Sequence, residues 1–100
     1  MRVLLLPFAK EDLKEIKAYL DERSPQASRS VAVRIKASLR LLSEQPYLGN
    51  SKEDEDILEW HIPGLPYTLP YRIINNEIQI LRVFHESQNK PSQWEAGSTQ

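Results

Sequence analysis

Three polar side chains near the end of the chain, Arg82, His85 and Gln88, have the residue types and spacing most able to do chemistry. Histidine can pass a proton near neutral pH, and arginine can lie beside a phosphate and stabilise its charge. The three residues are therefore the candidate target-binding site, and His85 with Arg82 is the candidate catalytic pair if the protein acts on a phosphodiester. Structural alternatives stand beside these roles: Arg82 could pair with a carboxylate or a carbonyl, His85 could be a hydrogen-bonded structural residue, and Gln88 could fix the chain after a strand.

Two alternating segments just before these residues predict a β-hairpin. Tyr67–Ile74 and Ile78–Phe84 carry aromatic and β-branched residues on both faces, as expected of strands inside a sheet. The Asn75-Asn76 pair between them suits a two-residue turn, because asparagine tolerates positive φ better than most residues. Pro70 cannot donate a ladder hydrogen bond, so a bulge or an unpaired position is expected there.

A regular register would decide which face each arginine of the hairpin takes. Arg82 alternates with apolar residues of its strand and is expected among three hairpin side chains, Tyr67, Leu69 and Phe84. Arg72 lies on the opposite pleat, is expected to face Gln79 across the strands, and belongs to the scaffold. Arg82 and His85 are therefore the pair expected to face a target.

The segments before the hairpin predict one strand, two helices and a further strand. In order, these elements are expected over Arg2–Leu6, Ala9–Glu22, Pro25–Ser43 and Ile57–Ile62. Pro7 closes the first strand, and Ser24 can cap the second helix. Short connections favour an antiparallel helix hairpin and a three-stranded antiparallel meander. The predicted fold class is α+β, with one sheet covered on one face by the helices.

The composition indicates one small domain without a cofactor. One hundred residues with no cysteine and two histidines provide neither disulfides nor an evident metal site. The apolar run Val3–Leu6 is too short for a signal sequence or a membrane span, so a cytoplasmic protein with no membrane contact is expected. The domain is expected over residues 1–91, and the polar tail 92–100 should be loose unless Trp94 docks on the body.

The net charge of −1 hides an uneven distribution. Residues 26–43 carry four basic side chains and no acidic one, whereas residues 52–59 carry five acidic side chains against one lysine. Arg29, Lys36 and Arg40 line one stripe of the second predicted helix, which could dock an acidic partner segment. The alternative for the stripe is a solvated surface. A protein that only grips nucleic acid usually carries more net positive charge, so that function is disfavoured.

Several segments along nearly the whole chain carry a family resemblance. They are A-K-E-D-L-K-E-I in the first predicted helix, L-L-S-E-Q-P-Y-L-G after the second, and, most specific, L-P-Y-T-L-P-Y-R-I followed by I-Q-I-L-R-V-F-H-E-S-Q. With the order of elements, these segments resemble the RelE/ParE toxin superfamily of bacterial toxin–antitoxin systems, and the H-x-x-Q ending (His85, Gln88) is closest to the ParE branch. Such a resemblance implies a small toxin that a cognate antitoxin holds inactive. ParE-like members typically poison DNA gyrase, and RelE-like members cleave mRNA on the ribosome.

The resemblance also implies how partners would bind. Antitoxin segments in this superfamily commonly wrap the toxin as a helix plus an extended strand, which implies a groove between the second helix and the sheet, rimmed by Arg29, Lys36 and Arg40. A toxin–antitoxin heterotetramer is expected, or a toxin homodimer when the antitoxin is absent. The target would be DNA gyrase or, in the alternative, the ribosome with its mRNA.

Some positions depart from the pattern of the superfamily. RelE-type nucleases usually have an arginine near the position of Thr68 and lysines before it, where this chain has an acidic loop. RNA cleavage needs proton transfer and cations around the phosphate, for which His85 and Arg82 are a thin set. ParE-like chains often have an arginine where Leu58 stands. Three hypotheses stay open: a gyrase inhibitor that is not an enzyme, a ribosome-dependent endoribonuclease, and a degenerate module that only binds its antitoxin.

Overall fold

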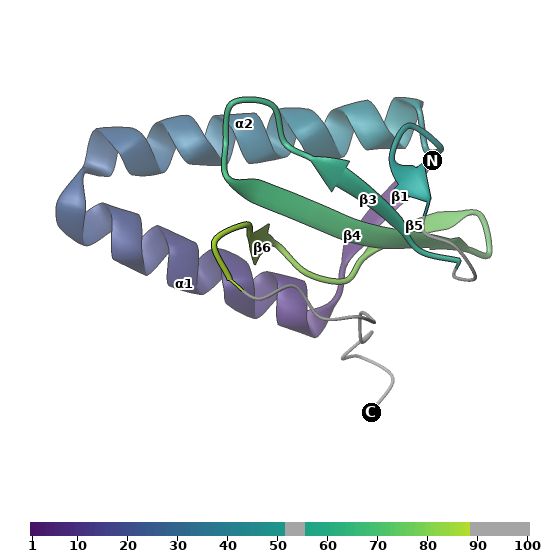
Figure 1. The fold of residues 1–100 in the computed structure, drawn as a ribbon, viewed down its shortest axis with the longest axis horizontal. Coiled ribbons are helices and arrows are strands. Elements are labelled where there is room, and N and C mark those ends of the chain that lie inside the picture. Colours follow the sequence, from purple (N-terminus) through teal and green to yellow (C-terminus); the bar gives the residue numbers. More distant parts are fainter. Residues whose placement is uncertain (52–55, 89–100) are drawn as a thin grey trace.

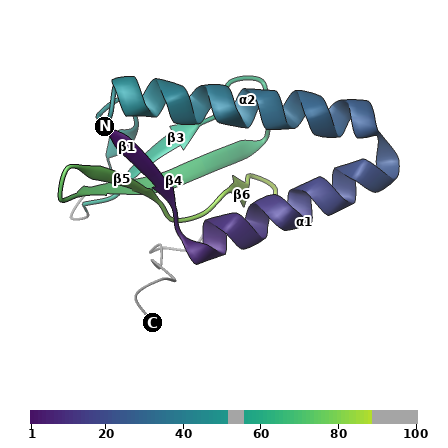
Figure 2. The ribbon, with the colours of Figure 1, turned by 180° about the vertical axis from the view of Figure 1, so that it is seen from behind.

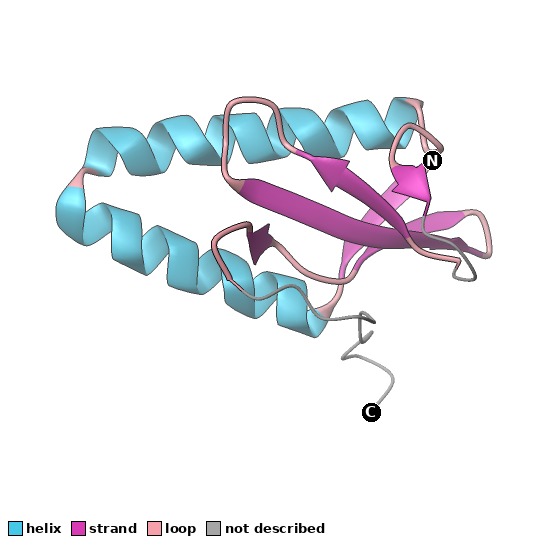
Figure 3. Cartoon of the chain, in the orientation of Figure 1, coloured by secondary structure: helices cyan, strands magenta, loops and turns pink. Residues whose placement is uncertain are grey.

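Two helices and six strands make up the part of the chain that the structure, a computed structural model, describes: residues 1–51 and 56–88. In chain order the elements are β1 (Arg2–Leu5), α1 (Pro7–Arg23), α2 (Pro25–Glu44), β2 (Asn50–Ser51), β3 (Leu58–His61), β4 (Tyr67–Ile74), β5 (Glu77–Ile80) and β6 (Phe84–His85). Figure 1 shows how they are arranged, and Figure 3 separates them by type. The predicted α+β class is confirmed.

Both helices begin at a proline. α1 starts at Pro7 instead of Ala9, so Pro7 opens a helix as well as ending a strand; the first turn of a helix does not need the missing N–H. α2 starts at Pro25 as predicted, and the Ser24 hydroxyl oxygen accepts a hydrogen bond from the Ala27 amide at 3.1 Å. The two helices join at Ser24 and diverge from there (Figure 2). Neither is long and apolar enough to cross a membrane.

The strands form one mixed sheet in the order β1-β5-β4-β3-β2, with β6 also paired to β4. The predicted meander is β3-β4-β5, in which each strand is antiparallel to its neighbour. β1 lies parallel to β5 at one edge, and the short strand β2, which was not predicted, extends the other edge. Asn75 and Asn76 have φ values of 53° and 60°, so the two-residue turn is confirmed.

The last predicted strand is interrupted by a bulge. β5 ends at Ile80 and β6 begins at Phe84, so three residues stand opposite only two residues of β4, Leu69 and Pro70. The Pro70 carbonyl accepts a hydrogen bond from the Leu81 amide at 2.8 Å. The irregularity that Pro70 predicted is therefore present, and it takes the form of a β-bulge on the neighbouring strand.

The bulge reverses the faces of the residues that follow it, because one extra residue shifts the alternation of side chains by one. Phe84 pairs with Thr68 and packs with Leu81 on the face away from the helices, instead of sharing the helix side with the residues of β5. His85 pairs with Tyr67 and lies on the helix side of the sheet. There the two rings meet edge to face, with their centres 5.3 Å apart. The predicted regular register beyond β5 was wrong.

The main core lies between the sheet and the two helices. Its buried members are Ala9, Ile35, Leu42, Ile62, Tyr67, Leu69, Tyr71, Ile78, Ile80 and Val83. Trp60 is half-buried against this core, and its indole N–H donates a hydrogen bond to the Ser38 hydroxyl at 3.2 Å, so β3 is anchored to α2. A smaller cluster of Leu6, Leu81 and Phe84 occupies the other face. Most of the acidic run and the tail with Trp94 lie outside the described residues.

Candidate functional site

An apolar groove of about 460 Å³ lies between α1 and α2. Its apolar lining includes one stripe from each helix, Leu13, Ile16 and Leu20 on α1 and Val31, Ile35 and Leu39 on α2, together with Leu5 of β1. Of these residues only Ile35 is fully buried; the others stay half-exposed. Because the helices diverge, neither covers the stripe of the other completely. The fold therefore leaves an open apolar groove between the two helices.

The three basic residues predicted to bind an antitoxin do not all lie on this groove. Arg29 and Lys36 line it, whereas Arg40 lines only a neighbouring hollow along α2, to which Lys36 also contributes. The main groove lies between the two helices and reaches the sheet only at Leu5 of β1, whereas the predicted groove lay between the second helix and the sheet. A smaller hollow of about 240 Å³ does lie between α2 and the residues after β3, but Arg34 lines it and none of the three predicted basic residues does. All three basic side chains are exposed and available to a partner.

A second, polar cleft of about 300 Å³ lies between α1 and the end of the sheet. His85 and Gln88, two of the predicted target-binding residues, line it, but Arg82 does not. The remaining lining residues are Asp12, Glu15, Ile16, Tyr19, Tyr67, Val83 and Ser87. The bulge explains this arrangement, since it turns His85 toward α1.

Arg82 is held in a bidentate ion pair with Asp12 of α1. Its Nε and Nη2 atoms donate hydrogen bonds to the two carboxylate oxygens at 2.7 and 2.9 Å, and the Val83 amide donates to the same carboxylate at 2.9 Å. The Asp12 side chain is 12% exposed and that of Arg82 is 32% exposed. The hydrogen bonds from Arg82 to Asp12 raise the pKa of the guanidinium above its ordinary value. The prediction that Arg82 lies among side chains of the hairpin was wrong. The structural alternative, in which Arg82 pairs with a carboxylate, is the one observed.

The hydrogen bonds of His85 select one tautomer of its ring. Its Nδ1 accepts a hydrogen bond from the Ser87 amide at 3.0 Å and lies 2.7 Å from the Ser87 hydroxyl. A ring nitrogen that accepts from an amide carries no proton, so the neutral ring is protonated on Nε2. In this tautomer Nε2 can donate a hydrogen bond but cannot take up a proton. Neutral His85 therefore presents Nε2–H as a hydrogen-bond donor, while Ser87 occupies its basic nitrogen, Nδ1.

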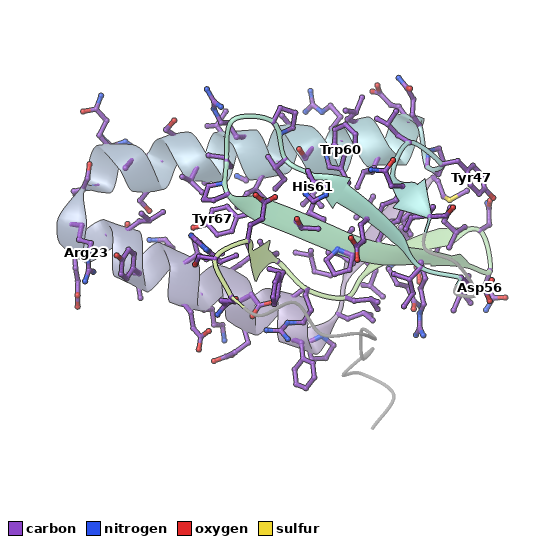
Figure 4. The ribbon with its side chains drawn as sticks, viewed as in Figure 1. Arg23, Tyr47, Asp56, Trp60, His61 and Tyr67 are labelled. Atoms are coloured by element: carbon purple, nitrogen blue, oxygen red, sulfur yellow. The ribbon has the colours of Figure 1, made fainter. Side chains whose placement is uncertain are left out.

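A polar cluster that the sequence analysis did not single out lies on the face of the sheet away from the helices. His61 Nδ1 lies 2.8 Å from a Glu86 carboxylate oxygen, and the Thr68 hydroxyl donates to the same oxygen at 3.0 Å. Figure 4 labels His61 on β3 and Tyr67 on the neighbouring strand β4. Hydrogen bonds from His61, then from Thr68, hold the pKa of Glu86 below its ordinary value. The cluster ties the turn after β6, which carries Gln88, to the middle of the sheet.

This cluster predicts a pH-dependent contribution to stability. The pKa of Glu86 is lowered from 4.5 in the folded protein, so its stabilising effect is present above pH 4.5 and is lost as the pH falls through the lowered value. The difference in unfolding free energy between wild type and Glu86→Gln should therefore shrink as the pH falls from about 5 through the lowered pKa of Glu86. Urea titrations of both proteins at each pH measure this difference in unfolding free energy. Glu44→Gln, which removes an exposed carboxylate with no hydrogen bond in the described chain, is the control. A constant difference for Glu86→Gln would contradict the assignment.

Comparison with known proteins places the chain in a family. Residues 3–90 match the family model described as "ParE toxin of type II toxin-antitoxin system, parDE". The chain belongs to the ParE toxin family. It is also 34% identical over 79 residues to a Sinorhizobium fredii protein named "Putative toxin Y4kP", covering 79% of this chain and 81% of that protein. The solved structure of the chromosomal ParDE system from P. aeruginosa superposes with a TM-score of 0.70 at 24% identity, covering 85% of this chain and 95% of the other, which supports the fold.

Helix α1 of this ParE-family toxin separates the two candidate surfaces. The apolar groove lies on its α2 side and the polar cleft on its β6 side, and Ile16 contributes to both. The groove has the chemistry of a docking surface for an apolar helix face. The cleft has hydrogen-bonding groups but, among the described residues, no lysine or arginine in its lining. The two surfaces therefore suit different partners.

Proposed function

We propose that this chain is a ParE-like toxin that inhibits DNA gyrase in the cytoplasm by binding it, and that a cognate antitoxin neutralises it. Membership of the ParE family supports the toxin assignment. The observation that carries the proposed mode of action is the lining of the polar cleft: Ser87 occupies Nδ1 of His85, and no lysine or arginine of the described residues lines the cleft. Phosphodiester cleavage needs a group that takes up a proton and cations at the phosphate, so binding is favoured over nuclease chemistry.

The open groove between the helices supports an antitoxin partner. A stable domain rarely leaves the apolar stripes of two helices half-exposed along a continuous groove, because burying them is favourable. An amphipathic antitoxin helix would cover these stripes, and acidic residues on its flank would meet Arg29 and Lys36. The antitoxin-binding residues that we propose are therefore Arg29 and Lys36 with the apolar lining, while Arg40 stands outside the groove.

The target is tested by separating gyrase from translation. Purified toxin should abolish supercoiling by gyrase, and induction without antitoxin should arrest replication. His85→Ala and Gln88→Ala should weaken inhibition, while Tyr47→Ala, at a side chain outside both surfaces, should not. Full supercoiling at large toxin excess would refute gyrase inhibition. Codon-linked mRNA cuts that His85→Ala abolishes would indicate the ribosome-dependent endoribonuclease instead, and unimpaired growth would indicate a degenerate antitoxin-binding module.

The antitoxin surface is tested by charge reversal on α2. The product of an adjacent antitoxin gene, purified with the toxin, should bind Arg29→Glu/Lys36→Glu about tenfold more weakly than wild type, because two rim charges then repel its acidic flank. Arg40→Glu applies the same kind of change to the same helix outside the groove and should bind nearly as well as wild type. Equal weakening by both variants would show that long-range charge, and not the groove, attracts the antitoxin. Light scattering on the complex would show whether it is a heterotetramer.

A further inference from the structure

The polar cleft between α1 and β6 has the lining of a cation-binding site. It combines two carboxylates, Asp12 and Glu15, with two tyrosine rings, Tyr19 and Tyr67. No lysine or arginine of the described residues lines it. Carboxylates pair with guanidinium and ammonium groups, and the faces of aromatic rings attract them as well. The cleft therefore favours a positively charged group over a phosphate.

The two carboxylates differ in how far their charge is already compensated. Asp12 accepts two hydrogen bonds from Arg82 and one from the Val83 amide, so a cation from outside would gain little from it. Glu15 is exposed and makes no hydrogen bond or ion pair with a described residue, although its charge also raises the pKa of Arg82. Glu15 is thus the carboxylate left to pair with an incoming cation.

The aromatic part of the cleft is already in contact with one guanidinium. Arg23 places its guanidinium carbon 3.6 Å from the ring centre of Tyr19 and donates a hydrogen bond to the Tyr19 carbonyl at 3.0 Å. Burial, and then the neighbouring Tyr19, raise the pKa of Tyr67 above 10.0, so its ring stays neutral at physiological pH. Neutral tyrosine rings keep the electron-rich faces that attract cations.

We propose that this cleft binds an arginine or lysine side chain that the target protein presents to the toxin. The inference rests on the proposed function and deepens it by naming the chemistry that the target-binding surface recognises. A volume of about 300 Å³ is at the small end for ligand pockets and suits one side chain. Glu15 would pair with the charge, the tyrosine rings would flank it, and the Nε2–H of His85 and the amide of Gln88 would bind acceptors of the adjoining backbone. A phosphate would meet the uncompensated carboxylate of Glu15 and, among the described residues, no lysine or arginine in the lining.

A charged probe and its neutral analogue test the cleft directly. Nα-acetyl-arginine amide, titrated into the isotope-labelled full chain, should shift the NMR signals of Glu15, Tyr67, His85 and Gln88 in a saturable way. Nα-acetyl-citrulline amide has nearly the same shape without the charge and should bind at least about threefold more weakly. Glu15→Gln should weaken the arginine probe by a similar factor, and Glu44→Gln, with the same change in charge on α2, should not. Equal binding of both probes, or no saturable shift, would overturn the proposal.

Further measurements distinguish a failure of this inference from a failure of the proposed function. Inorganic phosphate should not shift the cleft signals, and saturable phosphate binding there would overturn the cation site. Gyrase inhibition without arginine-probe binding would refute the cleft while leaving gyrase as the target. Probe binding without gyrase inhibition would retain the cation site and refute the target. If the toxin both binds the arginine probe and inhibits gyrase, the Glu15→Gln variant should inhibit gyrase less than the Glu44→Gln variant does. Equal inhibition by the two variants would show that the cleft is not the contact with gyrase and would overturn the proposal.

Discussion

Replacing Asp12 with alanine is expected to destabilise the fold by about 3 kcal/mol, because it leaves a partly buried arginine without its counter-ion. The carboxylate accepts three hydrogen bonds, two from Arg82 and one from the Val83 amide, across 70 residues of sequence. These contacts hold the bulge against α1, so the backbone amides around the bulge should exchange hydrogen faster in the Asp12→Ala variant than in the wild type. Urea denaturation followed by circular dichroism measures the stability, and hydrogen exchange measures the local opening.

Two further variants show whether the loss comes from this ion pair. Glu11→Ala removes an exposed neighbouring carboxylate of α1 and should change stability by less than about 0.5 kcal/mol. Arg82→Leu in the Asp12→Ala background removes the unpaired charge and should restore part of the lost stability. A double variant no more stable than Asp12→Ala, or an Asp12→Ala protein as stable as wild type, would contradict the role assigned to the pair.

Removing the hydroxyl of Tyr71 should cost about 2 kcal/mol, because two backbone groups lose their partner at a fully buried side chain. The hydroxyl donates to the Pro46 carbonyl at 2.8 Å and accepts from the Gly49 amide at 2.9 Å. Burial raises the pKa of Tyr71, so the phenol stays protonated and remains a donor. The hydroxyl thereby ties the turn after α2 to the middle of the sheet. Thermal and urea unfolding of Tyr71→Phe measure its contribution.

The same contact explains the glycine at position 49. A Cβ there would lie 2.7 Å from the Tyr71 hydroxyl oxygen and 2.9 Å from the Glu59 carbonyl oxygen. Both distances are shorter than a carbon–oxygen contact allows, so these oxygen atoms would have to move. Gly49→Ala should therefore also lower stability, by about 2 kcal/mol. Tyr47→Phe is the matched control, since its side chain is 74% exposed, and it should leave stability unchanged. A loss as large for Tyr47→Phe would show that the assay does not report on the buried hydroxyl.

Local patterns in the sequence determined the elements of this protein. The Asn75-Asn76 turn, the Ser24 cap and the alternation along Tyr67–Ile74 depend on neighbouring residues, and each is confirmed. The motif that ends in His85 and Gln88 pointed to the ParE family, to which the chain belongs. These inferences succeeded because turn, cap and strand preferences act over a few residues.

Only the tertiary structure decided how the candidate residues are grouped. Pro70 predicted an irregularity, but the form of that irregularity, an extra residue on the neighbouring strand, depends on pairing between strands. This bulge turned His85 toward α1 and separated it from Arg82. The partnership of Arg82 with Asp12 spans 70 residues, and no local pattern indicates it. The open groove likewise depends on the angle at which two amphipathic helices diverge. The sequence by itself determined the elements and the family, whereas side-chain partners and surfaces came from long-range packing, because distant segments must meet before their contacts exist.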